Sequence, residues 1–296
     1  MTSKNVLCIG SVLWDVIGRA SAVMRVGSDV PGRITRIPGG VAMNIAMTLR
    51  RFSMNPILLT AVGHDEEGDE LIAAADRLGM DTGFVYRSED LPTDIYMAIE
   101  GANGLISAIA DAHSLEAAGA KILRPLKDGR LGSEVTPYAG QIALDGNLTE
   151  ELLSEIAKSP LFMAADLRVA PASPGKAERL LSLLDCPNAT IYVNLEEAGL
   201  LCKEVFTSAA EAASALLSRG AANILVTDGG RAAAHASAAG VLTATPPEVL
   251  VTRVTGAGDT FMAAHMAAEA RGDGPDASLN AALRAAAVYV SGDVPS

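Results

Sequence analysis

The feature that most constrains the fold is a regular alternation between short apolar runs and longer stretches rich in Ala and Leu. The apolar runs occupy positions 6–9, 56–62, 141–144, 161–165, 190–193 and 223–227. The stretches between them have helical spacing, at 41–52, 69–78, 150–157, 176–184, 208–219 and 260–271. Strands that are continuous apolar runs and alternate with helices form parallel sheets covered on both faces. The sequence therefore predicts an α/β fold, a three-layer sandwich with a mostly parallel central sheet.

Two stretches in the first half of the chain depart from this alternation. Residues 16–38 mix polar and apolar side chains around glycines without a helical period. Residues 94–112 contain two β segments, 95–100 and 105–110, separated by Gly-Ala-Asn-Gly, which is typical of a hairpin. Because the chain shows neither an internal repeat nor a low-complexity linker, we expect a single domain over 1–296, with these two stretches forming a small β lid.

Composition excludes several classes of protein. Of the 296 residues, 49% are hydrophobic and 20% are charged, which excludes extensive disorder. The net charge of −12 argues against a broad nucleic-acid-binding surface, but backbone N–H groups can still hold a small anion. The three cysteines lack metal-binding spacing, and no apolar run approaches the roughly 20 residues of a membrane span. We therefore expect a cytoplasmic protein with free thiols and no nucleic-acid or membrane partner.

The most informative local motif is Thr-Gly-Ala-Gly-Asp at 255–259, which precedes the expected helix at 260–271. Small residues there let backbone N–H groups converge, and the helix dipole adds a partial positive charge that suits a phosphate. A carboxylate beside such an anion site is unfavourable unless it has a task, such as accepting a proton from an attacking hydroxyl. Asp259 is therefore a candidate general base. The alternative is a helix N-cap that follows a glycine turn.

Two further motifs suggest a ligand site near expected strand ends. Gly39 and Gly40 precede the helix at 41–52 and allow a ligand to approach the backbone closely. Asn44 lies on the first turn of that helix and can donate and accept hydrogen bonds, as a polyhydroxylated ligand requires. Asp15 follows the first expected strand, and open α/β sheets bind ligands at the carboxyl ends of strands. The alternatives are a glycine turn, an incidental Asn and a surface Asp.

Two other groups of residues have both structural and functional interpretations. Asp166 and Arg168 come after the expected strand at 161–165, so we expect them at the ligand end of the sheet, and with Lys176, which lies further on, they are candidates for a role near the phosphates. Trp14, beside Asp15, would either shield a bound ligand or anchor the core.

Taken together, these motifs resemble the PfkB (ribokinase-like) family of carbohydrate kinases over nearly the whole chain. The first family signature is carried by Gly39, Gly40, Ala42, Asn44, Ala46, Ser53 and Gly63. The second is the segment 255–259. Three segments between them are similar to further family motifs, namely Gly-His-Asp-Glu-Glu-Gly at 63–68, Asn-Leu-Glu-Glu at 194–197 and Thr-Asp-Gly at 227–229. Their order and spacing make the resemblance specific.

The resemblance implies a ribokinase-like fold and ATP-dependent phosphorylation of a sugar or nucleoside hydroxyl. The residues that it implies for catalysis are Asp259 as general base and, as an anion hole, the N–H groups of Gly256, Ala257 and Gly258. The residues that it implies for the substrate's sugar are Asp15, Gly39, Gly40 and Asn44. Those that it implies for ATP are Asn194, Thr227 and Gly229, with Glu197 beside Asn194 to position Mg²⁺.

Within the family, the similarity is greatest to the pseudouridine kinases, at 15–20, 96–99, 106–111 and 144–148. It implies transfer of the ATP γ-phosphoryl group to the 5′-hydroxyl of pseudouridine. The alternatives are a kinase of ribose, fructose, a keto-deoxy acid or another nucleoside, and a relative that binds such a ligand without turnover. The family's Asp before Gly-Ala-Gly, which helps to bind potassium in some relatives, has no counterpart here. Because β lids pair across dimers in related kinases, a homodimer through the lid is also expected.

Overall fold

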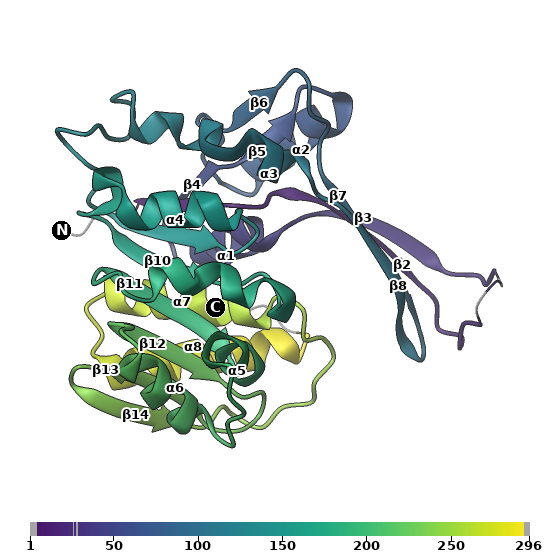
Figure 1. Ribbon diagram of the computed structural model, residues 1–296. Helices are drawn as coiled ribbons and strands as arrows, with labels where there is room; N and C mark the ends of the chain where they lie inside the picture. The colour runs from purple at the N-terminus through teal and green to yellow at the C-terminus, as the bar shows by residue number, and fades with distance from the viewer. Residues whose placement is uncertain (1–4, 26, 28, 293–296) are drawn as a thin grey trace.

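The computed structural model describes residues 5–25, 27 and 29–292, and its largest element is an eight-stranded sheet (Figure 1). The strand order is β14-β13-β12-β11-β10-β9-β1-β4. Strand β13 pairs antiparallel with β12 and β14, and the other neighbours pair in parallel. This confirms the predicted α/β class with a mostly parallel sheet. The bounds are β1 (Asn5–Ile9), β4 (Asn55–Leu59), β9 (Gln141–Asp145), β10 (Asp166–Ala170), β11 (Ala189–Asn194), β12 (Asn223–Thr227), β13 (Ala233–Ser237) and β14 (Gly240–Ala244).

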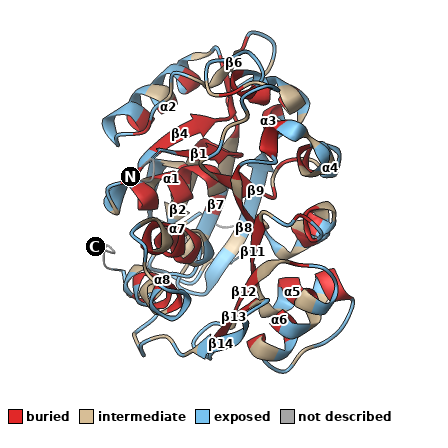
Figure 2. Ribbon diagram, turned by 90° about the vertical axis from the view of Figure 1, so that its left-hand side faces the viewer, coloured by how far each residue is buried: buried red, intermediate tan, exposed pale blue. Residues whose placement is uncertain are grey.

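Helices cover both faces of this sheet, so the molecule has the three predicted layers (Figures 1 and 2). Because strand side chains alternate, Leu7 and Ile9 pack into one core while Val6 and Cys8 pack into the other. The second core is shared with α1 (Val41–Arg51), α2 (Glu66–Arg77), α7 (Ala257–Ala270) and α8 (Pro275–Val290). The first is shared with α3 (Ser114–Ala118), α4 (Glu150–Lys158), α5 (Leu195–Cys202), α6 (Ala209–Ser218) and the 3₁₀ segments η1 (Gly119–Leu126), η2 (Pro160–Phe162) and η3 (Pro174–Leu183).

A separate four-stranded sheet projects from the body, and it contains both stretches that depart from the helix–strand alternation (Figure 1). Its order is β3-β2-β7-β8, and β7 and β8 form the predicted hairpin. We call it the small sheet. Its strands are β2 (Leu13–Arg19), β3 (Arg33–Gly39), β7 (Ile95–Gly101) and β8 (Gly104–Asp111). A third, two-stranded pair joins β5 (Ala61–Gly63) to β6 (Tyr86–Ser88).

Trp14 is a buried anchor where the small sheet joins the body. Its indole Nε1 donates a hydrogen bond to the carbonyl oxygen of Glu67 at 2.9 Å, and the Arg36 guanidinium lies 4.0 Å from the ring centroid. Because neighbouring residues on a strand point to opposite faces, Trp14 and Asp15 face in opposite directions. The core-anchor interpretation of Trp14 therefore holds, while Asp15 lies on the other face of the small sheet.

Three predicted elements differ from the structure. The run 56–62 divides into β4 and β5, which belong to different sheets, and 176–184 falls in the 3₁₀ segment η3. The run 161–165 was expected to be a strand, but Ser159 caps the 3₁₀ turn η2 here, accepting a hydrogen bond from the Leu161 N–H at 3.3 Å. An apolar run alone does not distinguish a buried turn from a buried strand.

The prediction that Asp166 and Arg168 lie at the ligand end of the sheet is therefore wrong. Both lie in β10, and Asp166 is the first residue of that strand, at the opposite, amino edge. The Arg168 guanidinium donates to both oxygens of Asp166, at 2.7 and 2.6 Å, and also pairs with Glu269. These residues and His235 line a cavity of about 340 Å³ at the amino edge. Paired charges allow an arginine to occupy a buried strand position.

Among the described residues, no helix has the length and hydropathy that crossing a membrane requires. The three cysteines, Cys8, Cys186 and Cys202, are all free and buried, which confirms the expectation of unpaired thiols.

Candidate active site

The carboxyl ends of the parallel strands bring together residues that are far apart in the sequence. Asn194 ends β11 and Thr227 ends β12, and the two residues pair in register. Asp145 ends β9, beside the strand β1 that leads to Ser11. Gly229 follows Thr227 in a turn with a positive φ of 57°. The predicted nucleotide residues therefore lie at one edge of the main sheet.

Helices α1 and α7 begin beside each other at this edge, and one hydrogen bond connects them. The Asn44 amide Nδ2 donates to Asp259 Oδ2 at 3.0 Å across 215 positions of sequence. The two family signatures, found separately in the sequence, are thus in direct contact.

The N-cap residues of α1 and α7 provide no side-chain cap, as at α3 and α8 and unlike those of α2, α4, α5 and α6. Their N-cap residues are Gly40 and Gly256, with φ of 94° and 86°, a region that favours glycine. Asp259 lies inside the first turn of α7, so the alternative interpretation as an N-cap does not apply. At α1, the Val41 N–H donates to Ser11 Oγ at 2.9 Å and the Met43 N–H donates to the Ser11 carbonyl at 3.4 Å, so the N–H donors left for a ligand lie mainly at the start of α7.

The Asp259 carboxyl is partly buried, and its pKa is raised. Burial raises its pKa to about 7, opposed by the Asn44 hydrogen bond and reinforced by the negative charges of Asp145, Glu197 and Asp15. A carboxyl that titrates near neutral pH is suited to accept a proton under physiological conditions.

The turn before Asp259 supplies two of the three predicted backbone donors. The Ala257 N–H donates to the Val254 carbonyl at 3.1 Å. Within residues 5–292, the N–H groups of Gly256 and Gly258 have no such partner. The carbonyl of Thr255 accepts a hydrogen bond from the Tyr289 hydroxyl at 2.9 Å, which holds the turn. An anion at this helix start would meet two free N–H groups and the positive end of the α7 dipole.

Asp15, Gly39 and Gly40 meet where the small sheet joins the main sheet. A Cβ atom on Gly39 would overlap the Asp15 carboxylate, and one on Gly40 would overlap the Ser11 carbonyl. Burial raises the pKa of Asp15 to about 6. The two glycines are therefore required for this close approach, which places the predicted sugar-binding carboxylate against the start of α1.

Asn194 and Glu197 form a capping box at the start of α5. The Glu197 N–H donates to Asn194 Oδ1 at 2.9 Å, and the Asn194 N–H donates to Glu197 Oε2 at 2.8 Å. Glu197 is buried, and this burial raises its pKa. Its second oxygen, Oε1, has no hydrogen bond to a described residue. The pair therefore has a structural role that leaves one carboxylate oxygen available.

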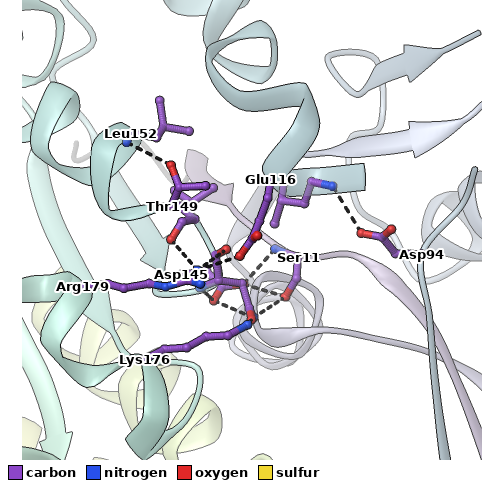
Figure 3. Close-up of polar contacts among 11 residues, drawn as sticks. Ser11, Asp94, Glu116, Asp145, Thr149, Leu152, Lys176 and Arg179 are labelled. Carbon is purple, nitrogen blue, oxygen red and sulfur yellow. Dashed lines mark hydrogen bonds and ion pairs between the residues drawn. The ribbon is translucent and has the colours of Figure 1, made fainter. Parts of the chain in front are cut away.

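A cluster around Asp145 was not predicted from the sequence (Figure 3). Asp145 is fully buried, and its Oδ2 accepts hydrogen bonds from the Ser11 N–H at 2.8 Å and the Ser11 hydroxyl at 2.6 Å. Ser11 Oγ in turn accepts from the Val41 N–H at the start of α1, at 2.9 Å. Asn147 and Lys176 continue the cluster. Two sequence signals pointed to it: the polar Asp-Gly-Asn at 145–147 directly after a predicted strand, and the resemblance of 144–148 to the pseudouridine kinases.

The model of the pfkB family of carbohydrate kinases matches residues 3–293. The chain therefore belongs to this family, as its sequence motifs predicted. The match spans both helix starts described above.

Three curated relatives illustrate the similarity. A pseudouridine kinase of Escherichia coli (strain K12) is 28% identical over 269 residues, 87% of this chain and 81% of that protein. A ribokinase of Bacillus subtilis (strain 168) is 26% identical over 298 residues, 97% of this chain and 93% of that protein. An uncharacterized sugar kinase of E. coli is 27% identical over 226 residues, 74% of this chain. The match covers only 59% of that sugar kinase, and only 44% of a pseudouridine kinase of Arabidopsis thaliana.

Solved structures show the same ribokinase-like fold, as predicted. A carbohydrate kinase from Agrobacterium tumefaciens has a TM-score of 0.80 at 25% identity, covering 97% of this chain and 90% of that one. An Arabidopsis thaliana ribokinase, solved with ribose and ATP, has a TM-score of 0.77 at 19% identity, covering 98% of this chain and 93% of that one.

We predict that Gly258→Ala separates ligand binding from folding. A Cβ at this position meets no atom within 4 Å, and alanine is the better helix former, so the melting temperature should stay equal or rise. A methyl group beside the free N–H donors should instead obstruct an anion, lowering kcat/KM for ATP about tenfold or more. Gly274→Ala, which also enters open space but lies beyond the C-terminal end of α7, is the control for kinetics. Unchanged kinetics for Gly258→Ala would contradict an anion site here.

Proposed function

We propose that this protein transfers the γ-phosphoryl group of ATP to the 5′-hydroxyl of a nucleoside, pseudouridine, giving pseudouridine 5′-phosphate. The observation that carries the proposal is the contact between Asn44 and Asp259, which joins the starts of α1 and α7. The substrate class is supported by the similarity to proteins named pseudouridine kinase in E. coli and A. thaliana. The B. subtilis ribokinase supports ribose as the second candidate.

The proposed chemistry follows from the two helix starts. The substrate hydroxyl donates its proton to the Asp259 carboxylate while its oxygen attacks the γ-phosphorus, and the bond to the ADP oxygen breaks. Negative charge on the transferring group faces the N–H groups of Gly256 and Gly258. Phosphoryl transfer depends mainly on alignment and charge stabilisation, which rigid helix starts provide. In comparable sites, one such donor contributes roughly 2.7–4 kcal/mol to lowering the barrier.

The residues at the carboxyl ends of β11 and β12 fit a nucleotide that carries Mg²⁺. Within the described chain, no group of three or more acidic, His or Cys side chains could hold a metal ion. Mg²⁺ commonly takes only one or two carboxylates from the protein and the rest of its ligands from phosphates and water. Glu197 has one free carboxylate oxygen for this purpose, and Asn194 stands beside it. Thr227 and Gly229 would then flank the nucleotide.

The small sheet would act as the lid of a single kinase domain. It carries Asp15 on the face opposite to Trp14, and Gly39 connects it directly to the start of α1. Closing over the substrate would exclude water, which competes with the substrate hydroxyl for the phosphoryl group.

A substrate panel tests the assignment. We expect ADP release with pseudouridine to exceed that with uridine, ribose or fructose by at least tenfold in kcat/KM. Faster turnover of ribose or fructose would contradict the nucleoside assignment and favour the sugar kinase. Binding of a ligand without ADP release would show that the protein is a non-catalytic relative.

The pH dependence tests the role of Asp259. Because the carboxylate is the active form, kcat/KM should rise with pH, with a midpoint near pH 7. Asn44→Ala removes a hydrogen bond that lowers this pKa, so the midpoint should move to higher pH.

Asp259→Asn should lower kcat by about 10²–10⁴-fold and abolish the pH dependence.

Asp259→Asn should also change the thermal stability of the protein in a pH-dependent way. The folded-state pKa of about 7 lies above the ordinary value of 3.8, so the carboxyl destabilises the fold increasingly from pH 3.8 to 7 and constantly above. Asp259→Asn should therefore melt roughly 2 °C or more above wild type at pH 8, and the gain should be smaller at pH 5. A variant with wild-type kcat, or with a lower melting temperature at pH 8, would contradict the proposed base.

We also propose that the lid joins two copies of the chain. On the face of the small sheet opposite to Asp15, the side chains of Ile34, Met97, Ile99 and Ile109 are 76%, 47%, 40% and 67% exposed. An exposed apolar face of this kind is uncommon on a monomer and typical of an interface. A second copy offers the same apolar face, which makes the surface self-complementary.

Solution mass tests the dimer. Light scattering or ultracentrifugation should give twice the chain mass, and the double variant Met97→Lys with Ile109→Glu should give the monomer. Val205→Glu changes a valine that is 96% exposed outside the lid and should leave the dimer intact. A monomeric wild type at about 100 μM would contradict the proposal.

A further inference from the structure

Lys176 brings unused hydrogen-bond donors to the ligand edge of the sheet. It lies in η3, after the carboxyl end of β10, and its ammonium donates to Asn147 Oδ1 at 2.5 Å (Figure 3). An ammonium group has three N–H donors. Among residues 5–292, no second acceptor contacts this ammonium, although the side chain is partly buried. Two donors are therefore left for a ligand.

The position of this ammonium is fixed by the buried carboxylate of Asp145. Asp145 can only accept hydrogen bonds, so it orients the Asn147 amide with Nδ2 toward Asp145 Oδ1, at 3.0 Å. The same Nδ2 lies 3.0 Å from Ser11 Oγ. The Asn147 carbonyl oxygen must therefore face Lys176. Asp145 and Asn147 thus act together as a rigid support that holds the ammonium in place.

The support connects Lys176 to the substrate side of the site. Ser11 contacts both Asp145 and Asn147, and its Oγ accepts a hydrogen bond from the Val41 N–H at the start of α1. Gly40 packs against the Ser11 backbone. The predicted nucleotide residues instead follow β11 and β12, whereas this support follows β9 and β1. Lys176 therefore lies toward the predicted sugar-binding residues.

Lys176 and Asp259 approach the strand ends from opposite faces of the main sheet. Segment η3 belongs to the core cluster shared by α4 and α5, whereas α7 belongs to the cluster shared by α1 and α8. A substrate whose hydroxyl reaches Asp259 and whose sugar lies over Gly40 would then extend its other end toward Lys176. In a nucleoside, the group at that end is the base.

We propose that Lys176 is a specificity-determining residue that donates hydrogen bonds to a carbonyl oxygen of a pyrimidine base, an inference that rests on the proposed nucleoside kinase function. A uracil ring presents carbonyl acceptors that a free sugar lacks. A charged donor makes a stronger hydrogen bond than a neutral one and becomes costly when its partner is missing. The lysine would therefore favour a nucleoside over a free pentose.

The test is Lys176→Met, which keeps the length of the side chain and removes the donors. With pseudouridine, KM should rise about tenfold or more, while KM for ATP stays within twofold and the melting temperature within about 1 °C. With ribose, kcat/KM should equal that of the wild type. Lys158→Met is the matched control, because that lysine lies on the exposed surface of α4 and contacts Ser154; it should change none of these values.

The outcomes separate this inference from the proposed function. If wild type phosphorylates pseudouridine but Lys176→Met leaves its KM unchanged, the function stands and the role of Lys176 is wrong. If KM for ATP rises instead, the lysine serves the phosphates, and the inference is overturned. If wild type phosphorylates ribose but no nucleoside, both proposals fail. An equal loss with pseudouridine and ribose would assign Lys176 to the sugar or the support, which also overturns base recognition.

Discussion

The hydrogen bond from the Asn44 amide to the Asp259 carboxylate is the interaction on which the proposed site depends. It joins two helices that begin at positive-φ glycines, and the first turn of α7 presents N–H donors at Gly256 and Gly258 that have no partner among the described residues. It also opposes the rise in the Asp259 pKa caused by burial and nearby carboxylates. This contact therefore positions the proposed base and lowers the pKa that burial raises.

The main sheet makes this contact possible by bringing together segments from both halves of the chain. Strand β1 lies between β4 and β9, so Ser11 reaches both the start of α1 and the buried carboxylate of Asp145. The nucleotide residues predicted after β11 and β12 lie farther along the same edge. The order of strands thus separates the predicted substrate residues from the predicted nucleotide residues, with α7 beginning at the edge they share. This arrangement suits a transfer reaction between two ligands.

Local patterns in the sequence were sufficient to predict the fold and the contacting motifs. Apolar runs buried on both faces predict the parallel sheet, and glycines before Asn44 and Asp259 predict helix starts that approach a ligand. What local patterns could not show are interactions between distant residues. Arg168 can occupy a buried position inside β10 because Glu269, 101 positions away, helps to neutralise its charge. Asp145 and Lys176 gain their places only when strands β9, β10 and β1 are adjacent.

A crystal structure with pseudouridine and a non-hydrolysable ATP analogue would test the proposed base and anion site together. We expect a carboxylate oxygen of Asp259 within hydrogen-bond distance of the 5′-hydroxyl. We also expect γ-phosphate oxygens on the N–H groups of Gly256 and Gly258. A complex in which the nucleoside hydroxyl lies away from Asp259, or the phosphates bypass the start of α7, would contradict the proposal.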